Sequence, residues 1–348
     1  MRYPKTLLEV VLLLTFISVH WAVVLPESYG SDGWTVRYNG PGNGYDGASA
    51  LVVDAEGNVY VTGRSAGVGP GSDYTTIKYN PAGTALWTKR YNGPANDWDE
   101  ARALGVDNEG NVYVTGESTG NGSGYDWSTV KYSSSGERLW AKRYNGPGND
   151  WDTASALAVD SEGNVFVTGY STGIGSGTDY TTVKYSSSGA VLWTKRYNGP
   201  GNSWDEACAL AVDAQGNVYV TGYSAGAGSG TDYTTIKYSP SGAVLWAKRY
   251  NGPGNGNDDA HAIALDSQGN VYVTGESEGT GSSSDYATIK YSPTGERLWA
   301  MRYNGPGNGI DDASGLAVDS QGNVYVTGNS QGAKSAGDYA TIKYSQYE

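Results

Sequence analysis

The sequence predicts an all-β fold in which one four-stranded unit occurs six times. The first observation is an internal repeat: Asp54 and Asp107 are 53 residues apart, and the same spacing continues as far as Asp319. The second is that apolar residues in each copy alternate with small or polar residues, which is the period of a β-strand. The third is that short turns containing Gly and Asp or Ser separate these segments. A repeat of this length indicates a solenoid or a propeller.

The N-terminal segment differs from the repeats. Arg2 and Lys5 precede an apolar run from Val10 to Leu25, a pattern typical of a secretory signal peptide. The run is shorter than the roughly 20 residues of a membrane-spanning helix. We expect residues 1–30 to form a signal peptide and connector, with an uncleaved anchor as the alternative. Residues 31–348 are then a single domain, extracellular or on the cell surface, that does not insert into the membrane.

Each unit contains four predicted strands, as the copy from Ala48 to Asn92 illustrates. Its segments ASALVVD and NVYVTG are joined by a D-x-x-G-N turn, and DYTTIKY and ALWTKRYN by a second short turn. Asp hydrogen-bonds the backbone of such a turn, and Gly supplies the positive φ that a tight hairpin requires. Four antiparallel strands repeated radially form the blades of a β-propeller.

The two ends of the repeat array supply parts of one unit. Trp34 to Asn39 matches the last strand of the repeat, five full copies follow, and Ala313 to Ser345 supplies three strands without the fourth. Pairing these ends would satisfy two exposed sheet edges, whereas a linear solenoid would gain nothing from the split. We therefore expect a six-bladed β-propeller, its ring closed by pairing the N-terminal strand with the three C-terminal strands.

The segments AIALDSQGNVYVTG, DYATIKYSPTGERLW and RYNGPGN resemble a bacterial β-propeller repeat family abbreviated SBBP. The resemblance extends from Trp34 to Ser345 and implies the propeller fold. The family's name implies seven blades, whereas this chain has material for six, so the blade count is not carried over. The resemblance implies no catalytic residues.

Composition limits the classes of partner. With 23 basic and 36 acidic residues the net charge is −13, which argues against nucleic acid and anionic membrane as partners. A single cysteine excludes an internal disulfide, and two histidines exclude a transition-metal cluster. We expect no cofactor, although calcium is possible because Asp side chains and loop carbonyls are its ligands. We expect a monomer.

Positions that differ between nearly uniform copies are the candidate binding positions. One of them belongs to the long-loop face, which is the end of the propeller formed by the blade-to-blade loops and the long Gly/Ser loops. There the first four copies carry an aromatic residue followed by Asp. Aromatic faces stack on sugar rings and carboxylates accept hydrogen bonds from hydroxyls. The alternative, which is the more usual role of Trp, is that each Trp packs its loop against the neighbouring blade. These candidates are Tyr45, Trp98, Trp151, Trp204, Asp99, Asp152 and Asp205.

Two further variable positions are expected at the mouth of the central channel. The first, in the innermost strand, carries Arg102, Cys208 and His261 in three of the copies. Cys208 and His261 fall on adjacent blades and suggest a thiolate–imidazole pair, but a lone Cys between alanines is usually a small buried residue. The second position, after the second strand, adds Tyr170 and Tyr223 as ligand-binding candidates.

These observations favour a secreted or cell-surface binding or scaffold propeller without enzymatic activity, which recognises glycan or a surface protein through the long-loop face. One alternative is a polysaccharide lyase or glycosidase with its site at the central funnel. Its best acid/base candidates are the carboxylate pairs Asp258/Asp259 and Asp311/Asp312. The other alternative is a purely structural surface protein.

Overall fold

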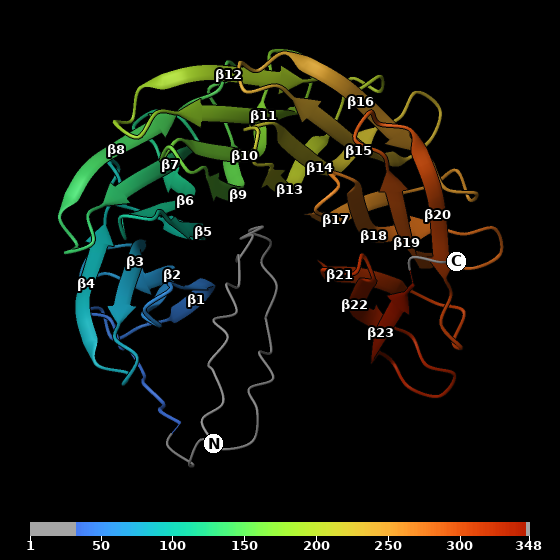
Figure 1. Cartoon of the computed structure of the whole chain (residues 1–348). Coiled ribbons are helices and arrows are strands. Elements are labelled where there is room, and N and C mark those ends of the chain that lie inside the picture. The colour runs from blue at the N-terminus through green and yellow to red at the C-terminus, as the bar shows by residue number, and fades with distance from the viewer. Residues whose placement is uncertain (1–32, 346–348) are drawn as a thin grey trace, which may run out of the picture.

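The computed structural model describes residues 33–345, which form 23 β-strands in six antiparallel sheets. The sheets are the blades of an arc around a common centre (Figure 1). The predicted signal peptide and connector, residues 1–30, lie outside the described residues. Between residues 33 and 345, no helix is long and apolar enough to cross a membrane.

Five blades have four strands each, and the sixth has three. Blade 1 consists of β1 (Asp46–Val53), β2 (Val59–Ala66), β3 (Ser72–Tyr79) and β4 (Ala85–Tyr91). Blade 2 consists of β5 (Asp99–Val106), β6 (Val112–Thr119), β7 (Tyr125–Tyr132) and β8 (Arg138–Tyr144). Blade 3 consists of β9 (Asp152–Val159), β10 (Val165–Thr172), β11 (Thr178–Tyr185) and β12 (Val191–Tyr197). Blade 4 consists of β13 (Asp205–Val212), β14 (Val218–Ala225), β15 (Thr231–Tyr238) and β16 (Val244–Tyr250). Blade 5 consists of β17 (Asp258–Leu265), β18 (Val271–Glu278), β19 (Ser284–Tyr291) and β20 (Arg297–Tyr303). Blade 6 consists of β21 (Asp311–Val318), β22 (Val324–Ser330) and β23 (Asp338–Tyr344).

The innermost strand of every blade contains a β-bulge. In β5 the pairing with β6 shifts between Ala101 and Ala103, so that Arg102 is the extra residue. The opposing residue is Gly116, and a Cβ there would overlap the carbonyl oxygen of Glu100. The close approach of the two backbones therefore requires Gly at this position. A bulge redirects the side chain of its extra residue. The side chain of Arg102, at the predicted channel-mouth position, therefore does not follow the alternation of its neighbours in β5.

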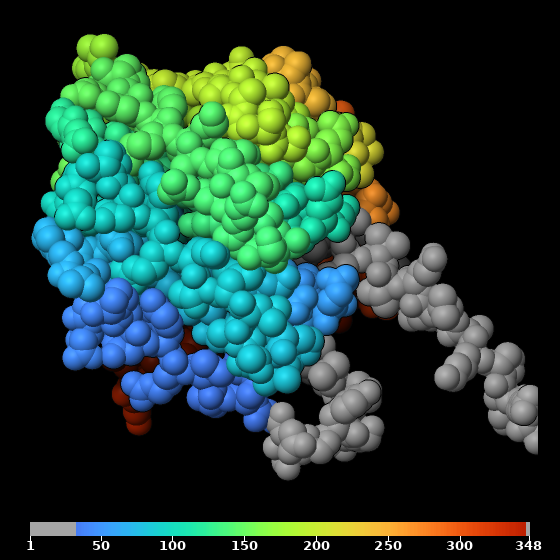
Figure 2. All heavy atoms as spheres, turned by 90° about the vertical axis from the view of Figure 1, so that its left-hand side faces the viewer, coloured from blue at the N-terminus to red at the C-terminus, as the bar shows by residue number. Residues whose placement is uncertain are grey.

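The core lies between the blades rather than inside one of them. Between blades 1 and 2, for example, Tyr60 and Tyr74 pack against Leu104 and Val114. At the outer edge, the side chain of Trp87 in β4 contacts blade 2. Its Nε1 donates a hydrogen bond to the carbonyl oxygen of Ser134, 3.1 Å away. The same Trp-to-turn bond links blades 2 to 3, 3 to 4 and 4 to 5. Figure 2 shows the outer side of the first blades, which pack together without a gap.

The predicted closure of the ring is not formed. Blade 6 has three strands, and residues 34–39 pair with none of them, so the arc is open between blades 6 and 1 (Figure 1). Residues 34–39 instead lie on blade 1, where Trp34 Nε1 donates to the carbonyl oxygen of Pro81 at 3.1 Å. This bond repeats the one that each fourth strand makes to the next blade. Residues 34–39 therefore contact a neighbouring blade as a fourth strand does, but they are not hydrogen-bonded into any sheet.

Candidate binding face and channel mouth

The loop that enters each blade is held in one conformation by its own side chains. In the loop before blade 3, Asn149 has a positive φ of 50°, a conformation that Asn tolerates better than most residues. Its Oδ1 accepts a hydrogen bond from Asn145 Nδ2 at 2.7 Å, and its Nδ2 donates to the carbonyl oxygen of Gly122 at 3.1 Å. The second bond crosses to the long loop of blade 2. These hydrogen bonds form a base that fixes the position of the loop tip.

The aspartates that follow the tryptophans are part of this base. Asp99, Asp152 and Asp205 have no exposed surface. The Oδ2 atom of Asp152 accepts a hydrogen bond from the backbone N–H of Gly146 at 2.5 Å, and its Oδ1 accepts one from Thr172 at 3.1 Å. The role predicted for these three carboxylates, hydrogen bonding to a ligand, is therefore wrong. They are buried and bind the backbone of their own loop.

The tryptophans themselves divide into two kinds. Trp151 and Trp204 keep 58% and 66% of their surface exposed. Trp98 is half-buried, and the guanidinium of Arg64 lies 4.6 Å from its ring centre. The same guanidinium lies 4.8 Å from the ring of the exposed Tyr45, so one cation bridges two aromatic residues. The packing interpretation therefore holds in part for Trp98 but not for Trp151 and Trp204.

Several residues beside these rings were missed by the sequence reasoning. Asp97, Asp150 and Ser203 directly precede the three tryptophans and are exposed. A signal was available, because the copies without Trp carry Gly at this position (Gly44, Gly256 and Gly309). By contrast, the Asp after the aromatic occurs in all six copies, which is the mark of a structural role. Tyr125 also belongs to the face, with its ring centre 6.1 Å from that of Trp151.

At the channel mouth, the bulged residues bind neighbouring side chains. Arg102 Nη2 lies 3.0 Å from Glu117 Oε1 in the same blade. The other oxygen of Glu117 accepts a hydrogen bond from the hydroxyl of Thr153 in blade 3, at 2.8 Å. His261 Nε2 of blade 5 lies 3.3 Å from Asp312 Oδ1 of blade 6. These variable residues thus connect strands and blades.

The predicted thiolate–imidazole pair does not form. Cys208 is partly buried, and its Sγ makes a polar contact with the carbonyl oxygen of Glu206 at 3.8 Å, whereas His261 faces Asp312. Burial raises the pKa of the Cys208 thiol well above its ordinary value, and the negative charges of Glu206 and Asp259 raise it further. A thiol in this environment remains protonated and is a poor nucleophile.

Tyr170 and Tyr223 lie beside these groups and are partly buried. The hydroxyl of Tyr223 hydrogen-bonds the carboxylate of Glu206, and burial raises the pKa of both side chains. The carbonyl oxygen of Tyr170 accepts a hydrogen bond from Trp127 Nε1 of blade 2 at 3.0 Å. Both tyrosines are thus more buried than Trp151 and Trp204 and do not belong to the row of exposed aromatics.

Carboxylates gather at the mouth of blades 4 to 6. Burial raises the pKa of Asp259, and the nearby Asp312 raises it further. Asp258 points to the other side of the strand, as the alternation of side chains requires, and its carboxylate accepts a hydrogen bond from Gly252 N–H at 2.7 Å. Asp258 and Asp259 therefore do not act as the acid/base pair considered from the sequence. Among residues 33–345, no group of three or more His, Cys, Asp or Glu side chains could hold a metal ion.

Comparison with known proteins identifies the repeat in part of the chain. Four segments match the SBBP family model, described as "Beta-propeller repeat": residues 86–122, 139–175, 245–281 and 299–333. The chain therefore contains four SBBP repeats. Each matched SBBP segment begins at the outermost strand of one blade and continues into the next, so the loops carrying Trp98 and Trp151 lie inside matched segments, and the loop carrying Trp204 does not.

The chain is also similar to other proteins. An uncharacterized WD repeat-containing protein of Acanthamoeba polyphaga mimivirus is 25% identical over 341 residues, which cover 80% of this chain and 24% of that protein. The β-propeller domain of the Trilobed protease from Pyrococcus furiosus is 9% identical with a TM-score of 0.47, over 86% of this chain and 82% of that one. A protein of unknown function from Dyadobacter fermentans is 12% identical with a TM-score of 0.46, over 85% and 94%. These structural likenesses concern the fold alone.

Proposed function

We propose that this SBBP propeller is a secreted or cell-surface module without enzymatic activity that binds glycans through its long-loop face. The observation that supports this most is the exposure of Trp151 and Trp204 at the same loop position of adjacent blades. Large exposed aromatics on a fixed loop lose little conformational freedom when they bind, so their contact energy is available for affinity.

The chemistry around the two rings suits a sugar. The face of an indole ring stacks on the C–H face of a pyranose, and each such stack contributes about 1 kcal/mol beyond the area that it buries. Asp150 and Ser203 lie beside the rings, are exposed and can hydrogen-bond sugar hydroxyls. The apolar side chains of Val68 and Ile174, exposed in the long loops, favour a surface protein as the second candidate partner.

The absence of enzymatic activity is proposed from the channel mouth. Arg102 and Glu117 form an ion pair there, and His261 lies 3.3 Å from Asp312. Glycoside hydrolysis requires two carboxyl groups that face one substrate bond, and Asp258 and Asp259 face opposite ways. The mouth is therefore better suited to hold the blades together than to carry out acid/base catalysis.

Binding to a glycan array tests this function. The wild-type protein is expected to bind a subset of glycans, and the double variant Trp151→Ala/Trp204→Ala should lose about 10- to 100-fold in affinity for them, because two stacks are removed. Ile310→Ala is the matched control, since Ile310 is an exposed apolar residue at the same position of blade 6. An array without hits, or hits with equal affinity for the double variant, would contradict the proposal.

The location outside the cell is proposed from Arg2, Lys5 and the apolar run that follows them. Mass spectrometry of the protein isolated from its host should find an N-terminus between about Ala22 and Ser31. Protein that retains Met1 in a cytoplasmic fraction would contradict the location without affecting the binding proposal.

A further inference from the structure

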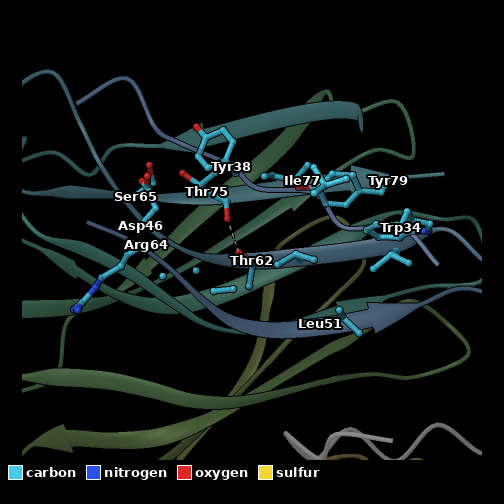
Figure 3. Close-up of a pocket in the computed structure, with 16 residues that line it drawn as sticks. Trp34, Tyr38, Asp46, Leu51, Thr62, Arg64, Ser65, Thr75, Ile77 and Tyr79 are labelled. Atoms are coloured by element: carbon cyan, nitrogen blue, oxygen red, sulfur yellow. Dashed lines mark hydrogen bonds between the residues drawn. The ribbon is translucent and has the colours of Figure 1, made fainter. Parts of the chain in front are cut away.

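The joint between blades 1 and 2 shows how the long-loop face surrounds a cation. Arg64 lies in β2, and Figure 3 shows its side chain extending away from that of Ser65. Its guanidinium lies 4.8 Å from the ring centre of Tyr45 and 4.6 Å from that of Trp98. Its Nη1 atom lies 2.9 Å from Oε2 of Glu100. Two aromatic rings and one carboxylate therefore surround one cation at this joint.

The joint between blades 2 and 3 brings together the same kinds of group, two aromatic rings and a carboxylate. The ring centre of Tyr125 lies 6.1 Å from that of Trp151. A Cβ placed on Gly124 would lie 2.7 Å from Trp151 Cδ1 and 3.0 Å from Asp150 Oδ1, so this carboxylate and the edge of the indole ring are close neighbours. Trp151 and Asp150 are exposed, and Tyr125 is partly buried. A ligand from solution can therefore reach the ring and the carboxylate together.

This second joint has no cation of its own. The residue that corresponds to Arg64 one repeat later is Glu117. Its carboxylate is buried and bound to Arg102 and to the hydroxyl of Thr153, so it does not fill the space beside the exposed rings. In the part of the chain that the structure describes, no Lys or Arg side chain lies over the ring of Trp151.

We propose that the joint between blades 2 and 3 binds a positively charged amino sugar, whose ring stacks on Trp151 and whose ammonium group pairs with Asp150. The ammonium group supplies the positive charge that Arg64 supplies at the joint before it. The inference rests on the proposed glycan binding and names the class of sugar that this site selects. An ammonium group beside an indole ring and a carboxylate gains both a cation–π contact and a charge-assisted hydrogen bond.

The electrostatics of this joint favour a cation over an anion. Burial raises the pKa of the Tyr125 hydroxyl, and the negative charges of Glu117, Asp97 and Glu100 raise it further. The same charges attract an ammonium group and repel a uronic acid or a sulfated sugar. The net charge of −13 acts in the same direction over a longer distance.

The joint between blades 3 and 4 provides an internal comparison. Trp204 is as exposed as Trp151, but the residue before it is Ser203 and not an aspartate. The residue that corresponds to Tyr125 in blade 3 is Thr178. This joint therefore offers a ring for stacking without the carboxylate and the second aromatic ring. We expect it to bind a sugar unit without selecting for the charge of that unit.

Titration with three matched tetrasaccharides tests the proposal. They are oligomers of glucosamine, of N-acetylglucosamine and of glucose with the same linkage, so that only one substituent of each ring differs. At about pH 5.5 the amino groups are protonated and an exposed aspartate is ionised. Calorimetry should give an affinity about 5- to 10-fold higher for the glucosamine oligomer than for the other two, because one cation–π contact and one exposed ion pair are added. This preference should disappear at about 1 M salt.

A pair of matched variants assigns the preference to one carboxylate. Asp150→Asn should lower the affinity for the glucosamine oligomer to that for the glucose oligomer and leave the latter unchanged. Glu56→Gln is the control, because it removes the same charge from an exposed residue in the turn between β1 and β2, at the opposite end of the propeller. This control variant should keep the preference.

Three outcomes would overturn the inference. Two of them, equal or weaker binding of the glucosamine oligomer by the wild-type protein and a preference that Asp150→Asn retains, would leave the proposed glycan binding intact. The third is the absence of binding to all three oligomers, and the glycan array then decides the proposed function separately.

Discussion

At the scale of single residues, the repeats separate structural from functional side chains. In the sequence, Asp99, Asp152 and Asp205 look like ligand-binding carboxylates because each follows a tryptophan. In the structure, each accepts a hydrogen bond from a backbone N–H of its own loop. Their recurrence in all six copies is the sequence signal for this role. The exposure of Trp151, in contrast to the half-burial of Trp98, could not be predicted, because it depends on the contacts that each ring makes in the folded chain, such as that of Trp98 with Arg64.

Asp99 provides a test at this scale. Burial raises its pKa from 3.8 to about 6, so the folded state holds the proton more tightly than the unfolded state. Its contribution to stability is therefore present below about pH 4 and is lost as the pH rises through about 6. Asp99→Asn keeps the shape without the charge and should raise the free energy of unfolding by on the order of 2 kcal/mol at about pH 7.5, with no gain at about pH 4.

Urea denaturation at the two pH values measures this difference. Asp97→Asn, two residues earlier and exposed, is the control and should change stability little at either pH. Equal effects of Asp99→Asn at both pH values would contradict the assigned role.

At the scale of elements, the strands follow directly from the alternating pattern. The predicted segments NVYVTG and DYTTIKY fall within or around β2 (Val59–Ala66) and β3 (Ser72–Tyr79). The bulge at Arg102 could not be predicted, because it depends on how closely two backbones approach at Gly116. Nor could the pairing of Arg102 with Glu117, which follows from the bulge and brings two variable positions together.

At this scale, the prediction concerns the stability contributed by Trp140 in the outermost strand β8. Trp140 covers the joint to blade 3, where its Nε1 donates to the carbonyl oxygen of Ser187 at 3.1 Å and its ring lies 6.1 Å from that of Tyr185. Trp140→Ala should lower the free energy of unfolding by about 2–3 kcal/mol, somewhat less than for a fully buried Trp. The neighbouring Leu139 points outward and is exposed, so Leu139→Ala should cost less than about 0.5 kcal/mol in the same denaturation experiment. Equal losses would contradict the assigned directions of the two side chains.

At the scale of the whole molecule, the repeat count predicted six sheets, and six are present. The pairing predicted from the split of one unit between the two ends is absent, although Trp34 contacts blade 1 as the Trp of a fourth strand contacts the next blade. What the sequence could not predict is that the arc stands open at this joint.

The most direct test compares how much stability is lost when loop tryptophans and strand tryptophans are replaced. The central claim is that Trp151 and Trp204 are held outward to bind, whereas the strand tryptophans hold blades together. The measurement is the free energy of unfolding of Trp151→Ala/Trp204→Ala, by urea denaturation beside Trp140→Ala. We predict a change within about 1 kcal/mol for the double loop variant, because it removes side chains that contact little. A loss as large as that of Trp140→Ala, about 2–3 kcal/mol or more, would contradict the account and assign these rings to packing.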